Sequence, residues 1–211
     1  MRILMVMAHP DDEVICGWPI LQGGAHEVAV IILANNYKKY GPGAIEALEE
    51  VGRQNKIEIV PFRRLDTNFS RIPPRSPNRK DFTLPLVVKQ FQTQIDEFIR
   101  TWRPECVFTH NPMGEYGHGD HRFTFNLVIL RLMNRLMLTD ICFANGSHLS
   151  SEYVPSVYAN GLYSGTKFRQ CHMDRMWYGS MKEIYKRHKA WSWSDGNEKQ
   201  IPKRCKLYTY G

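Results

Sequence analysis

The chain has 211 residues, of which 43% are hydrophobic and 23% are charged, a composition typical of a soluble protein with one sizeable core. It has no run of about 18 apolar residues and no export-signal pattern, so we expect no membrane span and a cytoplasmic location. Its five cysteines are odd in number and form no Cys-x-x-Cys pair. This spacing disfavours both a disulfide framework and a thiolate zinc site.

The net charge of +7 is concentrated in two stretches, residues 53–80 and 182–206, which each carry eight cationic side chains. A basic surface of this kind attracts phosphate, acidic sugars, nucleic acid or an anionic membrane. A solvated surface without a partner explains the same pattern, so both interpretations remain open at this point.

Short apolar runs predict strands, and apolar residues at spacings of three and four predict helices. In chain order these elements are strand 2–8, helix 13–21, strand 26–33, helix 43–56, strand 57–62, helix 84–102, strand 106–109, helix 120–138, strand 153–158 and helix 173–189. Residues 63–80 contain three prolines among arginines and are predicted to form a long loop. The tail from residue 191 has no clear periodicity.

Alternating strands and helices predict an α/β fold, with a mostly parallel sheet and helices on both of its faces. We expect one domain over residues 1–211, with a core over residues 1–138. The remainder, residues 139–211, would add a strand, a helix and a basic aromatic tail.

Two polar motifs each follow a predicted buried strand. Residues 8–13 read Ala-His-Pro-Asp-Asp-Glu after the first strand, and residues 110–121 after the fourth strand hold three further histidines and two carboxylates. An unpaired buried charge costs several kcal/mol or more, so groups this dense need a metal or a reaction to compensate them. The two strands are commonly neighbours at the switch point of such a sheet, which brings both motifs to one edge.

The residue types favour a catalytic metal centre with three protein ligands and one open position. His9 and Asp12 reach one ion together, and a histidine of the second motif completes the set. The metal lowers the pKa of a water to about 7, and Asp11 is available as the general base. His118 is the candidate to protonate a leaving nitrogen, and Tyr116 is a candidate donor to an oxyanion. Zinc is expected, while Fe2+, Co2+ and Mn2+ remain alternatives.

The sequence AHPDDE at residues 8–13, together with Tyr-x-His-x-Asp-His at residues 116–121, resembles the PIG-L and LmbE-like family of metal-dependent de-N-acetylases. The resemblance implies a Rossmann-like fold, zinc as the usual metal, and removal of N-acetyl groups from amino sugars. By position it implies these roles: His9, Asp12 and His121 as metal ligands, Asp11 as base, His118 as acid or oxyanion stabiliser, Asp120 as the group that orients His118, and Tyr116 as oxyanion donor.

The proline and arginine loop is the expected place for substrate contacts. Arg71 and Arg75 would bind a negative group bidentately, and Asp66 would bind a sugar hydroxyl unless it only forms a surface turn. The expected partner is therefore a small, negatively charged N-acetylated glycoconjugate. Nucleic acid is not expected as a partner, and an oligomer remains open.

Two other classes of function stay open on the sequence alone. A non-haem iron oxygenase also uses two histidines and one carboxylate, and a binding module for acidic ligands or nucleic acid would carry a vestigial metal site. For several single residues a structural role is an alternative to a catalytic one. His110 is as compatible with a supporting hydrogen bond as with catalysis, and Glu13 is expected to complement a helix dipole. His188 and Trp191 are candidates to close the pocket from the last helix, but an exposed His188 and a packed Trp191 are expected.

Overall fold

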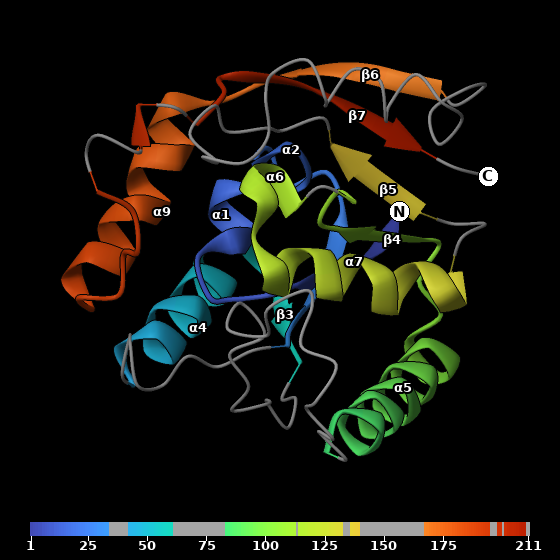
Figure 1. The fold of residues 1–211 in the computed structure, drawn as a ribbon. Helices are drawn as coiled ribbons and strands as arrows, with labels where there is room; N and C mark the ends of the chain where they lie inside the picture. The colour runs from blue at the N-terminus through green and yellow to red at the C-terminus, as the bar shows by residue number, and fades with distance from the viewer. Residues whose placement is uncertain are drawn as a thin grey trace.

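The computed structural model describes residues 1–33, 42–60, 83–112, 114–132, 136–139, 167–194, 198–199 and 201–209. Its strands and helices alternate over most of the chain (Figure 1). In chain order they are β1 (Arg2–Met7), α1 (Asp12–Ile15), α2 (Trp18–Leu21), β2 (Glu27–Ile32), α4 (Gly43–Asn55), β3 (Glu58–Ile59), α5 (Thr83–Trp102), β4 (Cys106–Thr109), α6 (Gly114–Gly117), α7 (Gly119–Leu132), β5 (Leu136–Thr139), β6 (Lys167–His172), α9 (Arg175–Arg187) and β7 (Arg204–Thr209).

The strands form one seven-stranded sheet in the order β3-β2-β1-β4-β5-β7-β6. The pairs from β3 to β5 are parallel, whereas β7 runs antiparallel to both β5 and β6. In Figure 1 the sheet extends from β6 and β7 at the top to β3 near the bottom. The predicted α/β, Rossmann-like class with a mostly parallel sheet is confirmed.

Helices cover both faces of the sheet because β1 is apolar on both sides. Ile3, Met5 and Met7 pack with apolar side chains of α1, α2, α4 and α9. Leu4 and Val6 point to the other face and pack with α5 and α7. All five side chains are fully buried, as expected for a central parallel strand.

The carboxyl ends of β1 and β4 lie side by side at the switch point of the sheet. Val6 pairs with Thr109 in the parallel register, and the Thr109 hydroxyl donates to the Val6 carbonyl at 2.8 Å. From β1 the chain continues towards β2, and from β4 it continues towards β5, so the next residues of both strands emerge at the same edge. The predicted convergence of residues 8–13 with residues 110–121 is confirmed.

The helix predicted over residues 13–21 is divided into α1 and α2 at Gly17. A Cβ atom on Gly17 would lie 2.5 Å from the Glu13 carbonyl oxygen and 2.9 Å from Cε of Met5, so only glycine fits against β1 here. Pro19 lies near the start of α2, where its missing N–H costs no intrahelical hydrogen bond. The periodicity predicted the apolar face but not the break.

The helix predicted over residues 120–138 extends too far. α7 ends at Leu132, and Leu136–Thr139 instead form the buried strand β5 between β4 and β7. A short apolar run fits a buried strand as well as a helix by periodicity alone, and here the neighbouring strands decide.

Three further elements differ from the sequence expectations. β3 is shorter than the predicted strand 57–62, while β6 and β7 were not predicted at all. β6 is largely exposed and polar, so it lacks the apolar alternation of a half-buried strand. The predicted strand 153–158 and the loop 63–80 lie outside the described residues.

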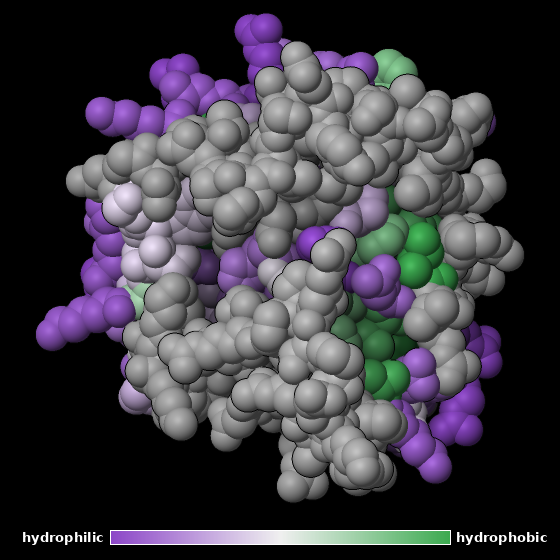
Figure 2. Space-filling view, in the orientation of Figure 1, coloured by the Kyte–Doolittle hydropathy of each residue, from purple (hydrophilic) through white to green (hydrophobic). Residues whose placement is uncertain are grey.

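The surface in the orientation of Figure 1 carries hydrophilic side chains around its rim and a group of apolar ones on the right (Figure 2). Among the described residues, the exposed large hydrophobic side chains are Met1, Phe168 and Met176. No helix in the described part of the chain is long and apolar enough to cross a membrane.

The Asp174 side chain caps α9 by accepting hydrogen bonds from the backbone N–H groups of Met176 at 2.9 Å and Trp177 at 3.2 Å. Replacing Asp174 by Ala should lower the free energy of unfolding by about 1 kcal/mol, as the loss of an N-cap does. Urea denaturation measures the change. Asp174→Ser keeps a capping oxygen and should lose much less, so equal losses in the two variants would contradict the capping role.

Candidate metal centre and active site

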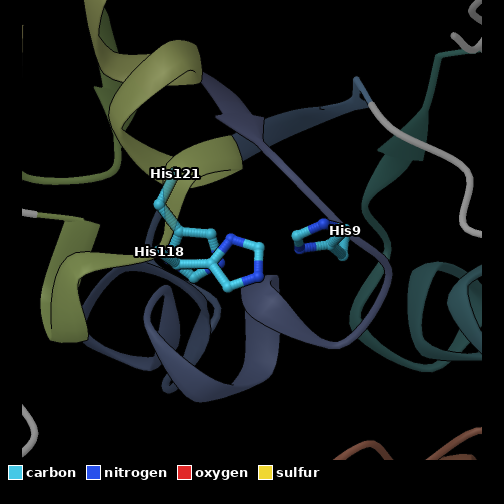
Figure 3. A group of neighbouring side chains, drawn as sticks. All are labelled: His9, His118 and His121. Atoms are coloured by element: carbon cyan, nitrogen blue, oxygen red, sulfur yellow. The ribbon is translucent and has the colours of Figure 1, made fainter. Parts of the chain in front are cut away.

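Three histidines from the two motifs meet at the carboxyl ends of β1 and β4 (Figure 3). His9 lies in the loop after β1, His118 immediately precedes α7, and His121 lies in the first turn of α7. The ring centroid of His9 is 5.0 Å from that of His118 and 5.5 Å from that of His121. The rings of His118 and His121 are 4.7 Å apart, so all three border one small space.

One carboxylate oxygen, Oδ2 of Asp12, is the point where the imidazoles converge. It lies 3.3 Å from Nδ1 of His9 and 3.3 Å from Nε2 of His121. The backbone N–H of His9 donates to the same oxygen at 2.8 Å and holds it in place. Two ligands of a tetrahedral zinc with bonds near 2.1 Å are about 3.4 Å apart, so this spacing fits a shared metal ion.

The outer nitrogens of both imidazoles face carboxylates. Nε2 of His9 lies 2.8 Å from Oδ2 of Asp120, and Nδ1 of His121 lies 2.7 Å from Oε2 of Glu115. A carboxylate at the outer nitrogen holds the proton there and leaves the inner lone pair for a metal. The inner nitrogens are the two that face Asp12. Two overlapping groups of donor atoms lie close enough together to hold a metal ion: His9 with His118 and His121, and Asp12 with His110 and His121.

His110 belongs to the same cluster but has a supporting role. Its Nε2 accepts a hydrogen bond from the backbone N–H of Ala8 at 3.0 Å, which uses the lone pair that a metal would need. Its Nδ1 lies 2.9 Å from Oε2 of Glu115, and its ring stacks on His121 at 3.8 Å. Of the two roles that the sequence left open for His110, the geometry favours the supporting hydrogen bond.

Glu115 is the functional residue that sequence reasoning missed. It follows Gly114, and both residues have left-handed backbones, with φ of 67° for Gly114 and 57° for Glu115. Oε2 of Glu115 contacts both His110 and His121, and Oε1 accepts from the backbone N–H of Asn111 at 2.9 Å. Burial opposes ionisation, but the two histidines lower the pKa of Glu115 to about 2. The sequence feature that could have indicated this role is that Glu115 is the acidic residue between His110 and His118.

Asp11 is buried beside the ligand set and faces other partners. Its Oδ2 accepts a hydrogen bond from the backbone N–H of Ser192 at 3.1 Å, whereas Asp12 faces the imidazoles. Burial, and then repulsion from Asp12 and Glu13, raise the pKa of Asp11 well above its usual range. A carboxylate in this environment binds a proton more readily than an exposed one, as a general base must.

Glu13 does more than complement a helix dipole, so that expectation needs correction. The side chain is fully buried. Its Oε1 accepts from the hydroxyl of Tyr185 at 2.5 Å, and its Oε2 accepts from the backbone N–H of Asp11 at 2.9 Å. Burial raises the pKa of Glu13 to about 7. No sequence pattern pointed to a partner 172 residues away.

The carboxylate of Asp120 faces His9, although the sequence predicted that it orients His118. The group of Asp120 that makes a hydrogen bond to His118 is its backbone N–H. The Asp120 N–H donates to Nδ1 of His118 at 3.2 Å, while its Oδ2 lies 4.0 Å from that nitrogen. Burial and the neighbouring His121 and His9 lower the pKa of His118 to about 3. A neutral His118 whose Nδ1 accepts a hydrogen bond carries its proton on Nε2 and can donate from there.

Of the remaining residues singled out in the sequence, four have side chains outside the described part and two, His188 and Trp191, are described. Tyr116 lies on α6, but its side chain is outside the described part, as are Asp66, Arg71 and Arg75. His188 is half-buried and faces Glu50 of α4 at 2.9 Å, so it is not the exposed side chain expected. Trp191 packs against Tyr178 and Tyr185, which confirms its expected packing role.

Comparison with known proteins places the chain in a family. Residues 4–131 match the model of the PIG-L family, described as GlcNAc-PI de-N-acetylase. The chain belongs to the PIG-L family. No curated protein sequence gives a significant match.

Solved structures of similar fold include deacetylases of antibiotic biosynthesis. The zinc-inhibited form of teicoplanin deacetylase Orf2 matches with a TM-score of 0.62 and 12% identity, covering 99% of this chain and 97% of that chain. The A40926 pseudoaglycone deacetylase Dbv21 matches with a TM-score of 0.58 and 16% identity, over 99% and 96% of the two chains. At such identities the similarity establishes the fold.

Replacing His121 by Ala should remove most of the bound zinc, because this change deletes one of the three donors. Metal analysis after dialysis against a zinc buffer measures the stoichiometry. His118→Ala should keep the metal if His118 is not a ligand, and His172→Ala, which removes an exposed histidine, serves as the control. Full zinc content in His121→Ala would contradict the ligand assignment.

Replacing Glu115 by Gln should destabilise the protein most near neutral pH. The pKa of Glu115 is lowered from 4.5 to about 2, so its charge stabilises the fold above about pH 4.5. That contribution is lost as the pH falls from 4.5 towards 2. Urea denaturation of chelator-treated protein over this pH range measures the free energy of unfolding. The difference in this free energy between the variant and the wild type should shrink as the pH falls. Glu97→Gln, on the exposed side of α5, is the control and should show no such trend. If the free energy of unfolding of Glu115→Gln differs from that of the wild type by the same amount at every pH, the charge of Glu115 does not stabilise the fold.

Proposed function

We propose that this protein is a zinc-dependent de-N-acetylase that hydrolyses the acetamide of an amino-sugar conjugate. The observation that carries the proposal is the approach of His9 and His121 to one oxygen of Asp12, with the buried Asp11 next to Asp12 in the chain. Membership of the PIG-L family supports the same reaction class.

A bound zinc ion would supply a water of pKa about 7 and polarise the amide carbonyl. Asp11 takes the proton of the attacking water, and its raised pKa suits this task. The C–N bond then breaks, acetate leaves, and the nitrogen departs as an amine after it gains a proton.

His118 acts on the other side of the scissile bond. Its Nε2–H, fixed by the hydrogen bond from the Asp120 backbone to Nδ1, donates to the developing oxyanion. His118 gives its Nε2 proton to the nitrogen as the C–N bond breaks, and the proton that Asp11 took from the water then replaces it on Nε2. Tyr116 is the second donor that we assign to the oxyanion.

The substrate that we propose carries a negative group, such as a phosphate, a nucleotide diphosphate or a uronate. Arg71 and Arg75 follow the third strand in the sequence, and the carboxyl end of that strand lies at the edge where ligands of such sheets bind. Arginine forks bind these anions bidentately, and Asp66 would bind a sugar hydroxyl.

Acetate release from N-acetylglucosamine, its 1-phosphate and its uridine diphosphate ester tests the activity directly. Hydrolysis should require zinc and stop with a chelator. Consumption of oxygen without acetate release would instead favour an oxygenase, and binding without turnover would favour a binding module.

Replacing Asp11 by Asn should retain zinc and lower kcat about a hundredfold or more, as the loss of a general base does. Acetate release and metal analysis on the same preparation measure both quantities. Asp174→Asn, which changes an exposed aspartate, should leave kcat unchanged. Loss of zinc from Asp11→Asn would make Asp11 a ligand instead of the base.

Substrates with a negative group should be hydrolysed in preference to neutral acetylated sugars, and the preference should weaken at high salt. Replacing Arg71 and Arg75 together by Ala should raise KM for the charged substrate alone. Arg100→Ala, on the exposed end of α5, is the matched control. Equal turnover of neutral and charged sugars, with KM unchanged in the double variant, would show that Arg71 and Arg75 do not bind the substrate.

A further inference from the structure

The backbone of Asp11 adopts a conformation that few residues other than glycine tolerate. Its φ of 90° and ψ of −21° lie in the left-handed region, where an L-residue with a side chain is strained. Strain of this kind persists only where surrounding groups hold it. Asp11 immediately precedes α1, so its backbone conformation sets where the carboxylate lies relative to Asp12.

Two groups from the C-terminal part of the chain hold Asp11. The hydroxyl of Tyr185 accepts a hydrogen bond from the Asp11 backbone N–H at 3.0 Å. The backbone N–H of Ser192 donates to the Asp11 carboxylate at 3.1 Å. One contact therefore fixes the main chain of Asp11, and the other fixes its side chain.

The Tyr185 hydroxyl is itself held by Glu13. It is fully buried and donates to Oε1 of Glu13 at 2.5 Å, while Oε2 of Glu13 shares the Asp11 N–H at 2.9 Å. Burial, together with the charge of Glu13, raises the pKa of Tyr185 well above its usual range. The hydroxyl thus keeps its proton and links Asp11 to Glu13, the two neighbours of Asp12 in the chain.

The helix that carries Tyr185 has its own anchor on α4. Trp177 Nε1 donates to the side-chain oxygen of Asn55 at 2.7 Å, and His188 faces Glu50 at 2.9 Å. α9 contacts both α4 and α1, and it lies beside them in Figure 1. The position of Tyr185 is therefore set by packing that does not depend on the metal centre.

We infer that Tyr185 is a positioning residue for the catalytic base, and that α9 with Ser192 completes the active site from outside the family-matched segment 4–131. The inference rests on the proposed function for the role of Asp11. Tyr185 itself neither touches the ligand set nor contacts the substrate in this assignment.

Tyr185→Phe keeps the ring and removes the hydroxyl, and Tyr178→Phe is its matched control on the same helix. Tyr178 is also buried, but its hydroxyl has no hydrogen-bond partner among the described residues. With the panel substrate that the wild type hydrolyses fastest, Tyr185→Phe should lower kcat about tenfold or more, because a misplaced base slows the reaction steeply. KM and zinc content should stay at their wild-type values, and Tyr178→Phe should match the wild type in all three.

Crystal structures of the two variants provide a readout that is independent of turnover. In Tyr185→Phe the Asp11 backbone should leave the left-handed region or its carboxylate should move away from Ser192, whereas Tyr178→Phe should retain both features. An unchanged Asp11 in Tyr185→Phe, or equal kcat for the two variants, would overturn the inference. If the wild type releases no acetate from any panel member, the proposed function fails, and the crystal structures alone decide whether Tyr185 positions Asp11.

Discussion

The parallel pairing of β1 with β4 is the constraint on which the rest of the site depends. It joins two segments that are about a hundred residues apart, and its register places the residues after Met7 beside those after Thr109. Every contact between the two histidine motifs follows from this pairing. The strand is held from both faces by apolar packing, so the edge that carries the motifs has a rigid base.

The centre tolerates so many buried ionisable groups because they occur in complementary sets. Asp12 and Glu115 each face imidazoles from more than one side, and Asp120 faces His9. Removing any one group would leave a buried neighbour without its partner, which costs more than the contact itself contributes. The same arrangement orients the inner nitrogens of His9 and His121 towards the carboxylate of Asp12.

The C-terminal part of the chain both extends the sheet and contacts Asp11. β7 extends the sheet next to β5, and α9 packs against α1 and α4 on the face where Asp11 lies. A strained residue such as Asp11 needs neighbours from several elements, because its own short helix has only one turn. The fold therefore surrounds Asp11 with groups from both ends of the chain.

The sequence by itself determined the α/β class and the convergence of the two motifs, which follow from local patterns: apolar runs, alternation of elements, and dense polar groups at strand ends. The same patterns predicted His9, Asp12 and one histidine of the second motif as candidate ligands, and only the family resemblance singled out His121. The tertiary structure alone decided that residues 136–139 form a strand, since a short apolar run fits either element until its neighbours are known. It also decided the contacts of Glu115 and Tyr185. A glutamate or a tyrosine acquires such contacts only from the partners that folding brings within hydrogen-bonding distance, and for Tyr185 those partners lie more than 170 residues away.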